Sequence, residues 1–143
     1  MSWVRKKLEA FSERVAAHEA GRTYSYSDFL ELINQATVNL PSGEKQIIEV
    51  DCETTLEGLA TLLAIVESRH IALPLPSELP ANECRRMREV AAKSSIYEKL
   101  EGSGLILFSS GTSNRPKGML HNFEVLMDRY KNISLRNDRC LQL

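Results

Sequence analysis

Residues 105–122 read LILFSSGTSNRPKGMLHN, and this stretch decides how the rest of the sequence is interpreted. Its first four residues are apolar, with the length and composition of a buried strand. A run of small and hydroxyl-bearing residues follows, which lets successive backbone N–H groups turn toward one point and bind an anion. Lys117 adds a compact charge suited to phosphate oxygens. The pattern predicts a phosphate-binding loop over residues 108–118. A solvated turn between two strands is the alternative.

The order of residues in this loop resembles the phosphate-binding signature of the adenylate-forming (AMP-binding) superfamily. That superfamily includes acyl-CoA synthetases, firefly luciferases and peptide-synthetase adenylation domains. Asn114 stands where the family has glycine, and asparagine tolerates left-handed backbone geometry, so we predict a positive φ there. The loop is not a Walker A motif, because Gly111 and Gly118 are too far apart and Lys117 precedes the second glycine.

The resemblance implies a role for each residue of the loop. Lys117 and Thr112 would be catalytic, since they would stabilise the charge that develops on departing pyrophosphate. The residues that would bind the phosphates of ATP or shape the loop around them are Ser109, Ser110, Gly111, Thr112, Ser113, Asn114, Pro116, Lys117 and Gly118.

Two residues beyond the loop are candidates for the substrate pocket. Relatives border the acyl pocket with a histidine three residues past the last glycine of the signature, or with an aromatic residue five residues past it. These positions correspond to His121 and Phe123. A histidine that caps the next helix is the alternative for His121.

The resemblance also implies a reaction. Family members join a carboxylic acid to ATP, release pyrophosphate, and pass the acyl group to a thiol of coenzyme A or a carrier protein. Mg²⁺ assists, and its protein ligands would lie beyond this chain. We therefore expect residues 1–143 to form a single partial domain, an N-terminal fragment of an acid–thiol ligase (acyl-CoA synthetase) that is inactive without the missing C-terminal part.

Two other functions remain open. The chain could be a non-catalytic interaction module that kept the loop as part of its fold. It could also be a hydrolase with Ser109 or Ser110 as nucleophile, although the sequence has no G-x-S-x-G elbow around either serine.

The alternation of predicted strands and helices predicts an α/β protein in which helices pack on a layered sheet. The resemblance implies that this is an N-terminal piece of the large domain of an adenylate-forming enzyme. Arg69 stands where the family usually has glycine, and Pro74 predicts that its strand ends near a sheet edge or rim. Gly102, Ser103 and Gly104 form a flexible lead into the apolar strand. Predicted strands cover residues 23–26, 46–50, 71–75 and 105–108, and predicted helices cover residues 3–20, 28–40, 55–68, 80–93 and a segment from Phe123, with Ser27 and Asn122 as caps.

Composition excludes several classes of function. The formal net charge of −1 gives no field that would attract nucleic acid or an anionic membrane. No apolar run approaches the roughly 18 residues of a membrane span. Cys52, Cys84 and Cys140 are odd in number and widely spaced, which predicts free thiols in a reducing cytoplasm and no metal site.

Overall fold

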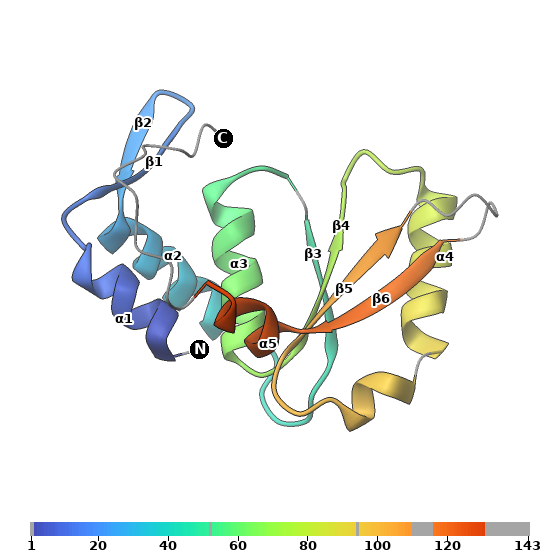
Figure 1. Cartoon of the computed structure of the whole chain (residues 1–143). Coiled ribbons are helices and arrows are strands. Elements are labelled where there is room, and N and C mark those ends of the chain that lie inside the picture. The colour runs from blue at the N-terminus through green and yellow to red at the C-terminus, as the bar shows by residue number, and fades with distance from the viewer. Residues whose placement is uncertain (1, 52, 94, 110–115, 131–143) are drawn as a thin grey trace.

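The computed structural model describes residues 2–51, 53–93, 95–109 and 116–130 (Figure 1). Strands β3–β6 form a four-stranded sheet and β1 pairs with β2 in a separate hairpin. The elements in chain order are α1 (Ser2–Ala10), β1 (Val15–Glu19), β2 (Arg22–Ser25), α2 (Tyr26–Val38), β3 (Ile47–Asp51), α3 (Leu56–Glu67), β4 (Ile71–Leu75), α4 (Ala81–Lys93), a 3₁₀ helix (Ser95–Lys99), β5 (Gly104–Ser109), β6 (Lys117–Asn122) and α5 (Phe123–Asp128).

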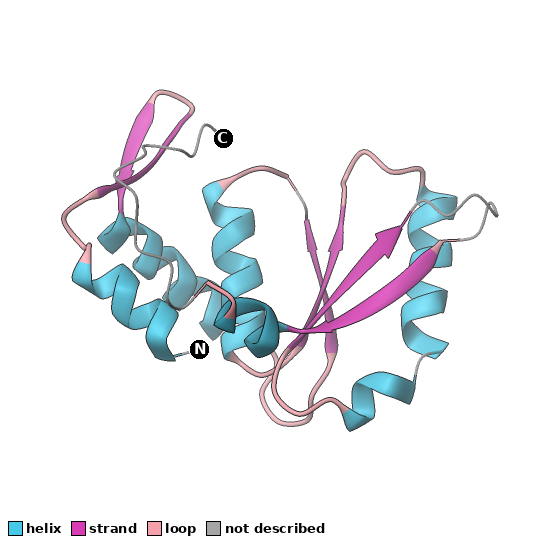
Figure 2. Ribbon diagram, in the orientation of Figure 1, coloured by secondary structure: helices cyan, strands magenta, loops and turns pink. Residues whose placement is uncertain are grey.

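The sheet is mixed and is covered on both faces, so the predicted α/β layered class is confirmed (Figure 2). Strands β3, β4 and β5 are parallel neighbours, and β6 runs antiparallel to β5. Helix α3 lies on one face and α4 on the other. Because the three parallel strands follow one another in the sheet while their helices cover opposite faces, the two crossovers have opposite hands. One of them therefore departs from the usual right-handed connection.

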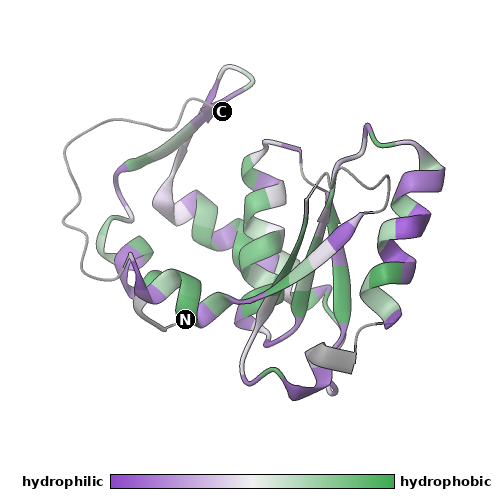
Figure 3. Cartoon of the chain, turned by 45° about the vertical axis from the view of Figure 1, so that its right-hand side comes forward, coloured by the Kyte–Doolittle hydropathy of each residue, from purple (hydrophilic) through white to green (hydrophobic). Residues whose placement is uncertain are grey.

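Successive side chains of the strands point to opposite faces of the sheet and belong to two hydrophobic clusters. Ala72 and Leu105 face α3, whereas Ile71, Leu73 and Ile106 face α4. Figure 3 shows hydrophobic strands beside a largely apolar α3, while α4 alternates hydrophilic and hydrophobic positions. The difference follows from packing, because α3 lies between the sheet and α2, whereas the outer side of α4 faces solvent.

Helix α3 confirms the predicted helix over residues 55–68. The hydroxyl of Thr55 caps it by accepting the N–H of Gly58 at 3.0 Å. The helical spacing of Leu56, Leu59, Leu63 and Val66 predicts that all four face inward, and all but Leu59 are buried. The prediction is wrong for Leu59, whose surface is 38% exposed.

A Schellman motif ends α3 and explains how Arg69 replaces a glycine. The N–H of His70 donates to the carbonyl of Ile65 at 3.1 Å, and the N–H of Arg69 donates to that of Val66 at 3.2 Å. Arg69 has a φ of 64°, in the left-handed region that favours glycine. The backbone thus keeps the glycine-type turn although the side chain is arginine.

The predicted helix over residues 3–20 is correct only as far as Ala10. Residues Val15–Glu19 form β1, which pairs with β2. The two residues between the strands, Ala20 and Gly21, have φ values of 48° and 78°, as a two-residue hairpin of type I′ requires. Gly21 therefore turns a hairpin and does not end a helix.

Helix α2 begins two residues earlier than predicted, with Ser25 as its cap in place of Ser27. The hydroxyl of Ser25 accepts the N–H of Asp28 at 3.1 Å, and the Asp28 carboxylate accepts the N–H of Ser25 at 2.7 Å. This capping box satisfies two backbone donors at once. The backbone N–H and then the hydroxyl of Ser25 hold the pKa of Asp28 below its ordinary value. Phe29, Ile33, Ala36 and Leu40 have the spacing of one helical face; the first two are buried and the other two are partly buried.

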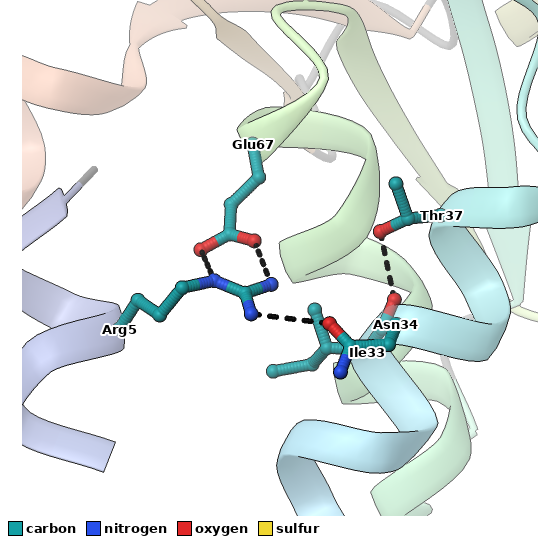
Figure 4. Close-up of polar contacts among 5 residues, drawn as sticks. All are labelled: Arg5, Ile33, Asn34, Thr37 and Glu67. Atoms are coloured by element: carbon teal, nitrogen blue, oxygen red, sulfur yellow. Dashed lines mark hydrogen bonds and ion pairs between the residues drawn. The ribbon is translucent and has the colours of Figure 1, made fainter. Parts of the chain in front are cut away.

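An arginine ties three helices together (Figure 4). The guanidinium of Arg5 in α1 donates to both carboxylate oxygens of Glu67 at the end of α3, at 2.7 and 3.4 Å. It also donates to the side-chain oxygen of Asn34 in α2 at 3.1 Å. Hydrogen bonding to Glu67 raises the pKa of Arg5 above its ordinary value. These contacts fix α1 against the α2–α3 pair.

Pro74 lies next to the end of β4, an interior strand, where it pairs with Val50 of β3 and where the pairing with β5 has already ended. Two apolar positions differ from the sequence-based expectation. Val90 on α4 is predicted to face inward and Leu107 belongs to the predicted buried strand, but both are exposed. None of the described helices combines the length and the apolar composition that crossing a membrane requires.

A candidate phosphate-binding hairpin

The predicted loop joins the two strands of a β-hairpin. Strands β5 and β6 pair at six consecutive positions, and Ser109 opposite Lys117 is the last pair before the turn. Strand pairing thus includes Phe108 and Gly118, at the ends of the predicted loop. Met119 and Leu120 lie in β6, and the helix predicted from Phe123 follows as α5. Six residues of the predicted stretch lie outside the described residues: Ser110, Gly111, Thr112, Ser113, Asn114 and Arg115.

Ser109 and Lys117 lie at the carboxyl edge of the parallel strands. Strands β3, β4 and β5 end at Asp51, Leu75 and Ser109, and Lys117 begins β6 at the same edge. Ligands of open α/β sheets bind outside the carboxyl ends of the strands. The lysine of the predicted signature is therefore placed where this class of fold binds ligands.

Gly118 lies against the face of the sheet that α4 covers. A side chain added at this position would place its Cβ 3.2 Å from the Phe108 ring and 3.5 Å from Val90. Contacts of 3.2 Å are tighter than most Cβ contacts, so a larger residue would push the ring away. The close packing of β6 against Phe108 and Val90 therefore favours glycine at position 118, independently of any role in the motif.

His121 and Phe123 have different environments. His121 is half-buried opposite Leu105, whereas Phe123 is 6% exposed and packs in the core cluster that contains α3. The cap of α5 is Asn122, whose side-chain oxygen accepts the N–H of Val125 at 3.0 Å. The prediction of Asn122 as the cap is confirmed, and the alternative of a capping role for His121 is wrong.

A buried contact at the foot of the hairpin was not predicted. Ser103 is fully buried, and both its N–H and its hydroxyl donate to the Glu124 carboxylate, at 3.1 and 2.9 Å. Gly102, with a φ of 83°, leaves room for that carboxylate, since a Cβ there would lie 2.7 Å from it. The Gly102–Gly104 segment is therefore fixed against α5, contrary to the flexible lead expected from its composition. Serine and glutamate so far apart in sequence carry no local signal for this contact.

Within the described residues, no group of three or more His, Cys, Asp or Glu side chains is arranged to hold a metal ion. Cys84 is a free thiol on α4.

Comparison with known proteins identifies the fold. No protein-family model matches the sequence, and no curated protein is similar to it. The structure is similar to the NpsA N-terminal subdomain of Klebsiella oxytoca, with a TM-score of 0.67 and 16% identity over 83% of this chain and 40% of that chain. The chain has the fold of the N-terminal subdomains of adenylate-forming enzymes. The resemblance inferred from residues 105–122 is confirmed at the level of the fold.

Two further structures have this adenylate-forming fold. One is the O-succinylbenzoate coenzyme A synthetase MenE of Bacillus subtilis in complex with AMP, with a TM-score of 0.60, 13% identity, and coverage of 81% of this chain and 40% of that chain. The other is the N-terminal domain of FACL13 from Mycobacterium tuberculosis, with a TM-score of 0.57, 13% identity, and coverage of 84% and 43%. The chain therefore spans about two fifths of the length of these structures.

Proposed function

We propose that this chain supplies the phosphate-binding hairpin of an enzyme that activates a carboxylic acid with ATP. A carboxylate oxygen attacks the α-phosphorus and forms a new P–O bond. The bond from that phosphorus to the bridging oxygen breaks, and pyrophosphate leaves with the electron pair. The observation that carries the proposal is the pairing of Ser109 with Lys117 at the carboxyl edge of an adenylate-forming fold.

The role proposed for the hairpin is electrostatic. Negative charge grows on the bridging oxygen as pyrophosphate departs, and the Lys117 ammonium would stabilise it. Thr112 and the neighbouring hydroxyls would donate hydrogen bonds to the same phosphates. Strand pairing fixes the backbone of Ser109 and Lys117, so the two ends of the loop are held in register before ATP binds. Mg²⁺ bound with ATP would neutralise further phosphate charge, and we propose that its protein ligands lie outside this chain.

We propose that residues 1–143 act as one part of a larger catalytic unit. The NpsA N-terminal subdomain, about two fifths of which this chain matches, has been determined with 3-hydroxybenzoyl-AMSN bound. Such a ligand needs contacts to adenine, ribose and acyl group in addition to a phosphate loop. The acyl group would pass to coenzyme A or a carrier protein in the cytoplasm, and His121 and Phe123 are the proposed acyl-side residues. The 143-residue chain alone should not catalyse acid-dependent exchange of pyrophosphate into ATP.

Titration of the isolated chain with pyrophosphate, followed by NMR of its backbone amides, tests the hairpin directly. We expect a dissociation constant in roughly the millimolar range, with the largest shifts at Ser109 and Lys117. Lys117→Ala should weaken binding at least ~10-fold, since a charge-assisted contact is lost. Lys93→Ala, at an exposed lysine of α4, is the matched control and should leave the affinity unchanged. Equal affinities for the wild type and the Lys117→Ala variant would refute the proposed role.

A further inference from the structure

Strand β6 forms one edge of the sheet in the described part of the chain. All six of its residues pair with β5 on one side, in a continuous register without a bulge. The sheet order ends at β6, so among the described residues no strand pairs with its outer side. Such an edge presents a row of backbone N–H and C=O groups that can pair with another strand.

The features that protect sheet edges are concentrated at the beginning of β6. Pro116 precedes the strand and Lys117 is its first residue. Residues 118–122 read GMLHN and contain neither proline nor a residue with a formal charge. Native edge strands usually carry inward-pointing charges, prolines or bulges that prevent pairing. Most of β6 is therefore open to pairing.

An exposed apolar pair lies directly beside this edge. Leu107 and Met119 are register partners, and 40% and 46% of their surfaces are exposed. They lie on the face of the sheet opposite α4, because their neighbours Phe108 and Leu120 pack into the cluster that includes α4. In Figure 1, β6 lies on the side of the sheet away from β3. An additional strand next to β6 would bury Met119.

We infer that β6 pairs antiparallel with β6 of a second copy of this chain, around a two-fold axis perpendicular to the sheet. An antiparallel edge is complementary to itself under such an axis, and the symmetry closes at two subunits. Two four-stranded sheets then become one continuous sheet of eight strands.

The same symmetry explains the exposed pair and the position of the charge. A perpendicular two-fold axis places the same face of both sheets on one side, so Leu107 and Met119 join the partner's Met119 and the partner's Leu107 in one apolar row. Antiparallel pairing brings Lys117 toward the carboxyl end of the partner's β6, which keeps the two lysines apart. The ends of the two hairpins that carry the pair of Ser109 and Lys117 lie at opposite ends of the interface. This inference is independent of the proposed function.

Light scattering coupled to size-exclusion chromatography, over a series of concentrations, tests the inference. The mass should rise from 16.1 kDa to twice that value, about 32 kDa. Met119→Lys places two like charges near the axis and should weaken dimerisation at least ~10-fold. The control is Val38→Lys on α2, where an apolar side chain that is 84% exposed lies on another element, and this variant should dimerise like the wild type.

A second variant and a second measurement keep the result interpretable. Met119→Thr removes apolar surface and introduces a β-branched residue suited to a strand, so it tests the interface if Met119→Lys unfolds. Hydrogen exchange of β6 amides should slow as the wild type is concentrated, and should not slow in either Met119 variant. A wild type that stays monomeric, assemblies larger than a dimer, or equal effects of the Met119 and Val38 substitutions would overturn the inference.

Discussion

Replacing Arg69 with glycine is expected to leave a more stable protein than replacing it with alanine. Arg69 holds a φ of 64° in the Schellman turn after α3. Both substitutions remove the same cation from the end of the helix, which costs about 0.3–1 kcal/mol. The two variants therefore differ only in how their backbones tolerate the left-handed conformation.

The magnitude follows from two opposing effects. The left-handed conformation costs a residue with a Cβ about 1–2 kcal/mol of conformational free energy, and it does not cost glycine this amount. Glycine in turn loses about 0.4–1 kcal/mol more conformational entropy on folding than alanine. The Arg69→Gly variant should therefore be about 0.5–1 kcal/mol more stable than Arg69→Ala. Relative to the wild type, glycine should be neutral or stabilising, and alanine should be destabilising.

Urea unfolding followed by circular dichroism measures these differences. The matched control is Glu89, an exposed residue in the middle of α4. In ordinary helical geometry glycine is less stable than alanine by about 1 kcal/mol, so Glu89→Gly should fall below Glu89→Ala. If Arg69→Gly were less stable than Arg69→Ala, as at Glu89, the turn would not have the conformation described above.

Three other predictions concern the site and the helix contacts. In the complete enzyme, Lys117→Ala should slow adenylation about a hundredfold, or about 3 kcal/mol, with an unchanged melting temperature; an unaltered rate of pyrophosphate exchange would contradict the assigned role. Glu67→Gln should lower the free energy of unfolding by about 1 kcal/mol. A double-mutant cycle with Arg5→Gln should give an interaction energy of this size between Arg5 and Glu67 at low salt, and a smaller one at high salt. The capping box lowers the pKa of Asp28 in the folded state from its ordinary 3.8. The ionised carboxylate therefore stabilises the folded protein above pH 3.8, and this stabilisation is lost as the pH falls through the lower folded-state pKa. Asp28→Asn should therefore reduce the dependence of the unfolding free energy on pH in this acidic range. An unchanged dependence would show that the Asp28 carboxylate does not contribute to it.

The segment from α3 to β4 could be predicted because its signals are local. Apolar residues recur at helical spacing between Thr55 and Ser68, both ends of the helix are capped by their own sequence, and a short apolar run follows. The N-terminal hairpin could not be predicted in this way. Val15–Glu19 is a strand because β2 pairs with it, and its small and polar residues fit a helix equally well.

The candidate site shows the same division between local and distant information. The order of residues after Phe108 indicates a phosphate-binding loop, since a signature is a local property. Strand β6 contains glycine, lysine and histidine, and it is extended because β5 supplies its hydrogen-bond partners. The position of Lys117 at the carboxyl edge depends on that pairing. The contact between Ser103 and Glu124 likewise arises when the folded chain brings β5 next to α5.

The contact between the half-buried carboxylate of Glu124 and the buried Ser103 has a mechanical consequence for any enzyme built on this hairpin. It clamps the first turn of α5 to Ser103, immediately before β5 begins, so the foot of the hairpin cannot pivot without leaving a buried hydroxyl and a backbone N–H unpaired. The full register between the strands prevents them from sliding past each other. Any closing movement that the proposed function requires would therefore leave the paired strands in place as far as Ser109 and Lys117.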